Sequence, residues 1–224
     1  MTTKLFIELH QPDWCFSLRN SSEKETTTMA KKASAPKLLA RRFPATPGQV
    51  LGPYFIANAK LQSKLFPAGA TGEEIRIDGQ VTSEDGTVIA DATVSVWIAD
   101  PKGRYDNQRD DGSTKPIAVK DHQYRGRIIS DKAGNFTFNF LRPGNYFDGG
   151  WNLWRPAHIH VVVEAKGYQT LTSQLYFEDD AQNKLDIPGD DFFLPELVVR
   201  LNPAVAKSGV VQKGIFNFVL AKAS

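Results

Sequence analysis

The stretch Trp154-Arg155-Pro156-Ala157-His158-Ile159-His160, which runs into Val161-Val162-Val163, holds two of the chain's four histidines. Pro156 favours an extended backbone ahead of the histidines, and the β-branched run behind them is typical of a buried strand. Side chains two positions apart in a strand point to the same face, so His158 and His160 are expected to aim their imidazoles in one direction. The pair fits a metal site, and it equally fits two hydrogen-bonded histidines in a core.

Short segments with strand character lie on both sides of this stretch. Asp85-Gly86 supplies a turn after an alternating run, and residues 128–140 are expected to form a hairpin around a turn at 131–135. Helical character is confined to 181–186 and 203–207. Strands are expected at 74–81, 92–98, 128–130, 136–140, 157–165, 170–177, 197–199 and 215–220. This spacing predicts an all-β fold, a β-sandwich of about eight mostly antiparallel strands whose long loops form the active site.

The first 50 residues differ in character from the rest of the chain. They are rich in Ser and Thr and then punctuated by prolines, which predicts an N-terminal arm over residues 1–50 that is poorly ordered up to about residue 35. Met29 opens a sequence that resembles a natural start, so residues 1–28 are interpreted as an upstream extension. A single β-sandwich domain is expected over residues 51–224.

Composition narrows the classes of protein to which the chain can belong. The net charge of +2 over 224 residues gives no basic surface for nucleic acid. A single cysteine, Cys15, excludes an internal disulfide framework and a Cys-based zinc cluster. No apolar run approaches the ~18 residues that cross a bilayer, and no basic segment precedes an apolar one at the N-terminus. We therefore expect a cytoplasmic protein with no nucleic-acid or membrane partner.

Among reactive side chains, two tyrosines are the best partners for the histidine pair. Tyr105 follows the strand that contains Trp97, and Tyr146 follows the strand at 136–140, so both lie where a strand gives way to a loop. A tyrosine in that position is more often an amphipathic residue at the edge of the core. The carboxylate pairs lie in turn-like stretches and are interpreted as solvated loop charges: Asp110-Asp111, Glu178–Asp180 and Asp190-Asp191.

The chemistry of a site with two phenols and two imidazoles is informative. Phenol has a pKa near 10, so binding it as phenolate at neutral pH needs a strong, hard Lewis acid. Fe(III) meets that need better than Zn(II) or Fe(II). The commoner non-haem iron pattern of two His and one carboxylate suits Fe(II) instead. Two phenolates and two neutral imidazoles would hold a ferric ion and leave room for substrate.

Several motifs follow one another over most of the chain. They are Val94-Ser95-Val96-Trp97-Ile98-Ala99-Asp100, Gly103-Arg104-Tyr105, Tyr124-Arg125-Gly126-Arg127, Phe140-Leu141-Arg142-Pro143-Gly144-Asn145-Tyr146, Trp154–His160 and Leu171-Thr172-Ser173-Gln174-Leu175-Tyr176-Phe177-Glu178. In this order, from Gly52 to about Leu220, the sequence resembles the intradiol ring-cleaving dioxygenases of catechols, closest to the protocatechuate 3,4-dioxygenase type.

The resemblance implies an oxidoreductase with a non-haem Fe(III) that cleaves an aromatic ortho-diol with O2, between its two hydroxyl-bearing carbons, to a cis,cis-muconate. Arg155 would stabilise negative charge on the ring, and Gln174 would lie beside the substrate. Tyr146 would leave the metal and accept a substrate proton. Four side chains would hold the iron: Tyr105, Tyr146, His158 and His160.

The resemblance also bears on substrate and assembly. The short gap between Tyr146 and His158 favours a protocatechuate-like substrate, with hydroxyquinol or a substituted catechol as the alternative. The loop 147–153 would line the pocket through Asp148 and Trp151, and Asp148 would be unhelpful beside a carboxylated ring. The run Gly52-Pro53-Tyr54 resembles a segment that a non-catalytic subunit places near the substrate, which implies substrate contacts and a homo-oligomer that shares this segment across an interface.

Two other hypotheses fit parts of the sequence. A non-enzymatic, transthyretin-like β-sandwich binding module would have similar strands and turns, but it would not need all four ligands. A zinc hydrolase using His158 and His160 would leave Tyr105 and Tyr146 unexplained.

Overall fold

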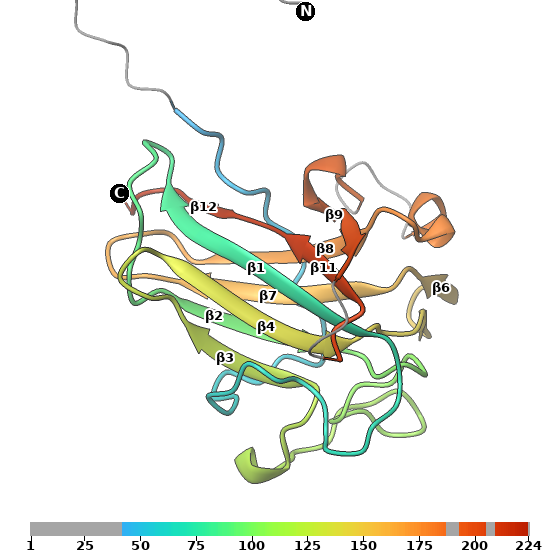
Figure 1. Cartoon of the computed structure of the whole chain (residues 1–224). Helices are drawn as coiled ribbons and strands as arrows, with labels where there is room; N and C mark the ends of the chain where they lie inside the picture. Colours follow the sequence, from blue (N-terminus) through green and yellow to red (C-terminus); the bar gives the residue numbers. More distant parts are fainter. Residues whose placement is uncertain (1–41, 187–192, 205–208, 224) are drawn as a thin grey trace, which may run out of the picture. The chain divides into compact units, whose positions relative to one another are not determined.

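Two β-sheets pack face to face in the part of the chain that the structure, a computed structural model, describes: residues 42–186, 193–204 and 209–223 (Figure 1). All of these residues belong to one compact unit. The first sheet holds, in order, β3 (Arg125–Ile129), β2 (Thr93–Ile98), β7 (His158–Glu164), β8 (Leu171–Phe177) and β9 (Val198–Val199).

The second sheet is built around the longest strand, β1 (Glu74–Ser83). Its order is β10 (Leu201–Pro203), β11 (Gln212–Ile215), β1 and β12 (Phe218–Leu220), and β4 (Asn135–Leu141) also pairs with β1. Outside the sheets lie a hairpin of β5 (Tyr146–Asp148) and β6 (Leu153–Arg155) and the short 3-10 helices η1 (Val119–Asp121), η2 (Ala181–Leu185) and η3 (Pro195–Leu197). Six of the nine pairings between described strands are antiparallel, so the predicted all-β sandwich is confirmed.

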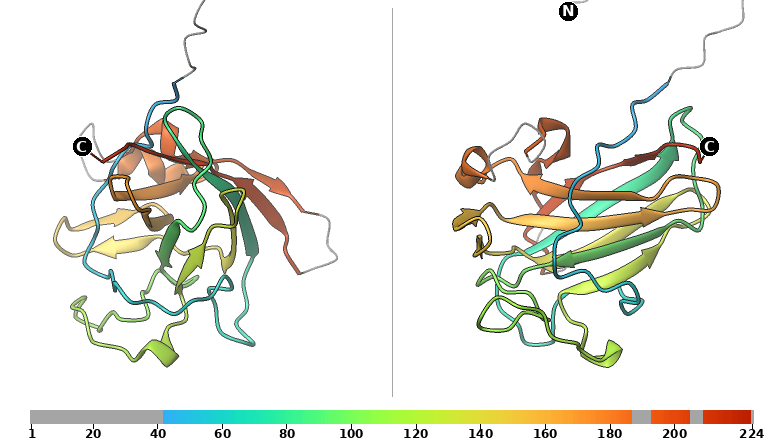
Figure 2. Two further views of the ribbon diagram at one scale, coloured as in Figure 1. Left: turned by 90° about the vertical axis from the view of Figure 1, so that its left-hand side faces the viewer. Right: turned by 180° about the vertical axis from the view of Figure 1, so that it is seen from behind.

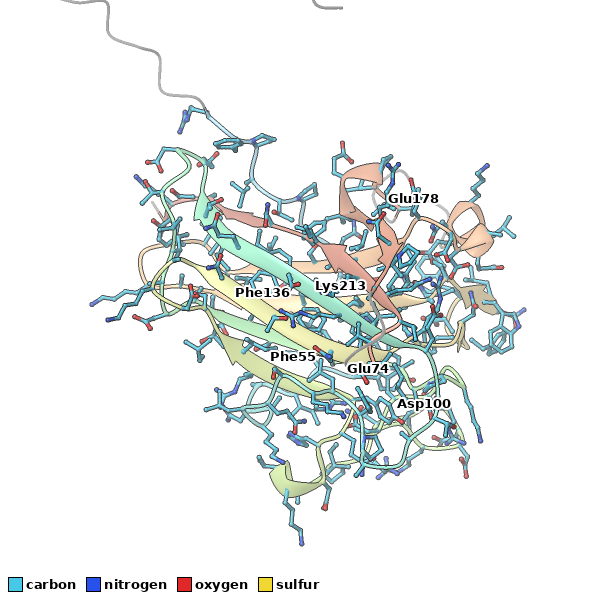
Figure 3. All side chains as sticks on the ribbon, in the orientation of Figure 1. Phe55, Glu74, Asp100, Phe136, Glu178 and Lys213 are labelled. Carbon is cyan, nitrogen blue, oxygen red and sulfur yellow. The ribbon has the colours of Figure 1, made fainter. Side chains whose placement is uncertain are left out.

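The core lies between the two sheets. On β7, Ile159, Val161 and Val163 are each fully buried in it, because alternate side chains of a strand share one face. From the opposite sheet β4 contributes three phenylalanines, of which Phe136 is labelled in Figure 3. Burying one such side chain contributes about 1.5–3 kcal/mol. His158 and His160 therefore lie on the outer face of the first sheet, away from this core.

Strand positions agree with the sequence-based expectations, but one pairing is wrong. The predicted strands at 92–98, 157–165 and 170–177 correspond to β2, β7 and β8. The turn at 131–135 is present, with Asp131 N–H donating to Asn135 O at 2.9 Å. It does not close a hairpin, because β3 pairs with β2 and β4 pairs with β1 in the other sheet. The apolar residues on both sides of this turn face one core from opposite layers.

Two further segments differ from expectation. The single strand expected at 215–220 is two strands, β11 and β12, both parallel to β1. The ladder breaks between them because the side chain of Asn217, and not a backbone carbonyl, accepts from Gln80 N–H at 3.0 Å. The helical stretch expected at 181–186 is the 3-10 helix η2. In the stretch expected at 203–207, Pro203 ends β10, and residues 205–207 lie outside the described residues.

The described part of the predicted arm, residues 42–50, is hydrogen-bonded to the sandwich. Thr46 N–H donates to Val219 O at 2.9 Å, and Gln49 N–H donates to Thr172 O at 2.7 Å. In the right-hand view of Figure 2 this segment crosses the outer face of the first sheet. The chain then continues to Gly52, which lies against the ring of His160. Residues 1–41, including the part expected to be poorly ordered, lie outside the described residues.

None of the helices in the described residues is long and apolar enough to cross a membrane.

Candidate active site

The two histidines of β7 converge through their ring nitrogens. His158 Nε2 and His160 Nε2 are 3.1 Å apart, and both side chains are buried. The same face carries their cross-strand neighbours: Trp97 on β2 and Gln174 on β8 lie opposite His160, and Tyr176 lies opposite His158. The i, i+2 spacing therefore does place both imidazoles on one face.

Both imidazoles are neutral rings that can offer a nitrogen lone pair to a metal ion. Pro156 O can only accept, so His158 Nδ1 carries a hydrogen and donates it at 2.7 Å, which leaves a lone pair on His158 Nε2. His160 Nδ1 is buried and bonds to none of the described residues. Burial, followed by the charge of Arg155, lowers the pKa of His158 to about 3, and burial lowers that of His160 well below its ordinary value. Both rings therefore stay unprotonated at neutral pH.

The tyrosine loops pack directly against each other. Gly144 N–H donates to Asp100 O at 2.9 Å, and Asn145 O approaches Gly103 so closely that a Cβ there would lie 2.1 Å from it. Only glycine fits at that contact. Tyr105, two residues on, places its hydroxyl 3.2 Å from His158 Nε2.

Tyr146 reaches the site through the β5–β6 hairpin, which the sequence did not predict. It opens β5 and pairs with Arg155 on β6, so it lies beside the stretch that carries the histidines. Its ring centroid is 5.7 Å from that of Tyr105 and 6.4 Å from that of His158. Its hydroxyl donates to Asp148 Oδ2 at 3.2 Å. Tyr146 thus packs against Tyr105 and His158 while its oxygen has an acceptor, Asp148, outside the candidate ligands.

The residues present fit a metal ion of high charge. Donor atoms held about 2.1 Å from one cation at angles of 90–110° lie about 3.0–3.4 Å from each other. The distances from His158 Nε2 to His160 Nε2 and to the Tyr105 hydroxyl, 3.1 and 3.2 Å, meet that spacing. Burial raises the pKa of Tyr105 and of Tyr146, so a phenolate forms here only beside strong positive charge. Within the described ranges no cluster of three or more His, Cys, Asp and Glu side chains is found. Two imidazoles and two phenols are the donors available, a set that suits a ferric ion better than zinc.

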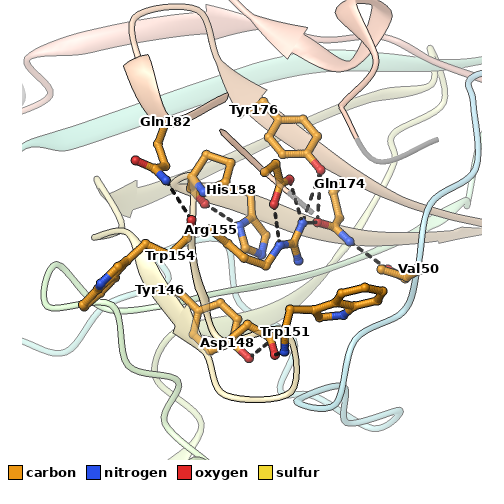
Figure 4. Close-up of polar contacts among 12 residues, drawn as sticks. Val50, Tyr146, Asp148, Trp151, Trp154, Arg155, His158, Gln174, Tyr176 and Gln182 are labelled. Carbon is orange, nitrogen blue, oxygen red and sulfur yellow. Dashed lines mark hydrogen bonds and ion pairs between the residues drawn. The ribbon is translucent and has the colours of Figure 1, made fainter. Parts of the chain in front are cut away.

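A buried ion pair fixes the guanidinium of Arg155 next to this group (Figure 4). Arg155 Nε and Nη2 donate to the two carboxylate oxygens of Asp186 at 2.8 and 3.0 Å. Nη2 also donates to Gln174 Oε1 at 2.9 Å. Burial alone would lower the pKa of Arg155, but the bonds to Asp186 outweigh burial and hold the pKa above its ordinary value. Arg155 therefore stays charged, and its Nη1 makes no hydrogen bond to any described residue.

The segment from Val50 to Phe55 covers the site from within the same chain. Gln174 Nε2 donates to Val50 O at 3.1 Å. Gly52 has a φ of +72°, and a Cβ there would lie 2.9 Å from His160 Cε1. Tyr54 stacks on Tyr105 with ring centroids 4.4 Å apart. Pro53 is exposed, so of the three residues expected to contact substrate, only Gly52 and Tyr54 pack against the candidate ligands. The predicted homo-oligomer stays a prediction, since this segment reaches the site without a second chain.

The loop from 147 to 153 closes the β5–β6 hairpin at the edge of the site. Asp148 Oδ1 accepts from the backbone N–H groups of Gly150 and Trp151, at 2.9 and 3.3 Å. These bonds fix the carboxylate, whose other oxygen accepts from Tyr146. Trp151 is largely exposed, and Figure 4 shows its indole on the same side as Val50 and Gln174. Both loop residues expected near the substrate therefore lie at the edge of the site.

Three functional neighbours were missed from the sequence. Asp186 belongs to an acidic segment that resembles the solvated loop charges around it. Trp97 stacks on His160 with ring centroids 4.8 Å apart and planes 4° from parallel. It sits in a regular strand pattern, where an aromatic residue predicts only packing. Arg125 is fully buried although arginines are usually exposed, and nothing in its sequence motif predicts which groups it binds.

Comparison with known proteins matches residues 50–222 to the family model Dioxygenase_C, described as "Dioxygenase". The chain is 28% identical over 190 residues to a chlorocatechol 1,2-dioxygenase of Cupriavidus pinatubonensis, which covers 77% of this chain and 68% of that protein. It is 31% identical over 160 residues to a hydroxyquinol 1,2-dioxygenase of Rhizobium sp., covering 63% and 51%. The crystal structure of 3-chlorocatechol 1,2-dioxygenase from Rhodococcus opacus 1CP has a TM-score of 0.68 and 30% identity, covering 80% of this chain and 74% of that one.

Proposed function

This chain belongs to the dioxygenase family of intradiol ring-cleaving enzymes, and from that premise we propose that it cleaves a catechol-type ring with O2 at a non-haem Fe(III). The observation that carries the proposal is that His158 Nε2 lies 3.1 Å from His160 Nε2 and 3.2 Å from the Tyr105 hydroxyl. Tyr146 is proposed as the fourth ligand.

The chain's own residues supply binding, orientation and charge. Ferric iron, when bound, supplies a Lewis acid that lowers the proton affinity of the two substrate hydroxyls. Tyr146, which would help to hold the iron, is proposed to accept a substrate proton at its phenol oxygen; the acceptor that its hydroxyl already has in Asp148 supports this role. Arg155 is proposed to stabilise negative charge on the ring, because it is charged, buried and held in place before substrate arrives. Gln174 on β8 is proposed to orient that guanidinium through the hydrogen bond from Arg155 Nη2.

We further propose that the preferred ring has no carboxylate substituent. The hairpin fixes Asp148 beside Tyr146, so a negatively charged group on the ring is repelled there. Chlorocatechol and hydroxyquinol, after which the relatives are named, have no such group. A hydroxyquinol or substituted catechol is therefore favoured over the protocatechuate-like substrate that the spacing of Tyr146 and His158 suggests.

A substrate panel tests both proposals. Protein loaded with Fe(III) should be burgundy-red from tyrosinate-to-iron charge transfer, and it should take up O2 with catechol, 4-chlorocatechol and hydroxyquinol to give muconates. A colourless protein that holds its full iron content, or yellow extradiol semialdehydes as products, would contradict the assignment. Asp148→Asn should raise kcat/KM for protocatechuate relative to catechol. An unchanged ratio would remove Asp148 from the selection of substrate.

A further inference from the structure

A buried cation outside the proposed ligand set, Arg125 on β3, is 1% exposed and makes contacts to two loops at once. Its Nε donates to both carboxylate oxygens of Asp106, at 2.9 and 3.1 Å, and its Nη2 also bonds to Asp106. Nη2 donates to Asn107 Oδ1 at 2.7 Å as well. Asp106 and Asn107 directly follow the candidate ligand Tyr105.

The remaining arm of this guanidinium reaches the segment that covers the site. Arg125 Nη1 donates to the backbone carbonyl of Tyr54 at 2.8 Å, and Asn107 Nδ2 donates to the same carbonyl at 3.3 Å. One carbonyl thus receives two donors, one of them charged, and charge-assisted hydrogen bonds are about twice as strong as neutral ones. Residues 51–58 contain no helix or strand, so contacts of this kind set where the segment lies.

The hydrogen bonds of Arg125 and Asn107 to the Tyr54 carbonyl hold the ring of Tyr54 against the candidate ligand Tyr105. The rings of Tyr54 and Tyr105 are stacked, 4.4 Å apart and 18° from parallel, and Tyr54 meets Tyr146 edge-on at 5.9 Å. The Tyr54 hydroxyl is fixed at its far end, donating to Gly112 O at 2.9 Å. A phenol that binds through one oxygen is free to turn about its own axis, so the orientation of Tyr105 depends on what packs on its face. Next along the segment, Phe55, labelled in Figure 3, packs on Trp97 with ring centroids 5.0 Å apart.

We propose that Arg125, with Asp106 and Asn107, is a positioning residue that holds Tyr54 on the face of Tyr105 and so fixes the phenol for metal binding. The inference rests on the proposed function, because it takes Tyr105 as a ligand. The bond to the carbonyl of Tyr54 is what connects this guanidinium to the ring on the face of Tyr105.

The test compares three variants loaded with Fe(III). Arg125→Met combined with Asp106→Leu removes both charges, so no uncompensated charge stays buried. Tyr54→Leu removes the stacked ring itself. Arg127→Met is the control, because Arg127 lies on the same strand and its Nε also donates to a backbone carbonyl of the preceding segment, that of Ala59, at 2.7 Å. The readouts are the rate of iron release to a hydroxamate chelator and the position of the charge-transfer band.

The first two variants should each release iron about 10–100-fold faster, the usual cost of removing a partner that orients a ligand, and each should shift the band. Combining them should add little to Tyr54→Leu alone, because both act through one ring. Arg127→Met should match the wild type. In the metal-free proteins, amide hydrogen exchange at residues 52–56 should quicken for the charge-pair variant and not for Arg127→Met. If the charge-pair variant fails to fold, Asn107→Ala should speed iron release in the same direction.

The outcomes that contradict the positioning role differ from those that contradict the proposed function. Iron release at the wild-type rate from the folded charge-pair variant would overturn the positioning role, as would effects that multiply in the combined variant. A wild-type protein that takes up Fe(III) without a charge-transfer band would overturn the proposed function and this inference with it. A wild-type band together with unchanged variants would overturn the positioning role alone.

Discussion

Arg155 and Asp186 hold opposite charges side by side, with both side chains almost fully shielded from water. Removing one partner of such a pair leaves the other charge buried and costs about 3–5 kcal/mol. We expect Asp186→Asn to lower the free energy of unfolding by roughly that amount and to slow turnover while iron is retained. Asp179→Asn is the matched control, because it breaks the exposed pair with Arg142 and should cost about 1 kcal/mol or less. Denaturant unfolding compares the two, and equal losses would contradict a buried role for Asp186.

At the scale of single residues, the sequence singled out the candidate ligands and not the residues that hold those ligands in place. His158, His160, Tyr105 and Tyr146 stand out because each has an unusual neighbour or spacing. Asp186 has neither, since its role depends on η2 bringing it back to a guanidinium 31 residues earlier. Long-range partners of this kind have no local signal.

At the scale of elements, a substitution at Gly52 tests whether the segment that crosses the outer face of the first sheet supports His160. Alanine there would meet two obstacles, a φ of +72° and the ring of His160. Gly69 has a similar φ of +79° with open space around it, so Gly69→Ala isolates the backbone strain, about 1–2 kcal/mol. We expect Gly52→Ala to lose at least this much stability and also to bind Fe(III) more weakly, as measured by chelator competition. Equal iron affinity in the two variants would show that the segment does not support His160.

The sequence predicted a strand correctly where the local pattern of apolar residues was enough to specify it. The β-branched run of β7 and the alternation in β2 and β8 each specify a strand without help from the rest of the chain. The β5–β6 hairpin was missed because its strands have three residues each, which is too short for a period to appear. The false hairpin around 131–135 arose because a turn signal gives no information on whether the flanking strands pair or change layer.

For the whole molecule, the two neutral imidazoles make the metal-free protein sensitive to acid. The pKa of His158 is about 3 in the folded state, against an ordinary value of 6.5, and that of His160 is also lowered. Between these values the unfolded chain binds more protons than the folded one, so the free energy of unfolding falls as the pH drops from 6.5 towards 3. Each such histidine contributes a slope of up to about 1.4 kcal/mol per pH unit. Urea unfolding across this range should show the slope, and His158→Gln should reduce it. A flat profile would mean that the imidazoles are solvated.

The outer placement of the site has a consequence for how such a chain can diverge. On β7 the odd-numbered residues fill the interior while His158 and His160 face the other way. Alternate residues of β7 therefore serve the candidate site and the core. Substitutions at the site residues can accumulate in evolution without disturbing the core packing. A duplicated gene that lost both imidazoles would still encode a sandwich with its interior intact. Its descendants would keep the cover formed by residues 50–55 and the charged guanidinium of Arg155.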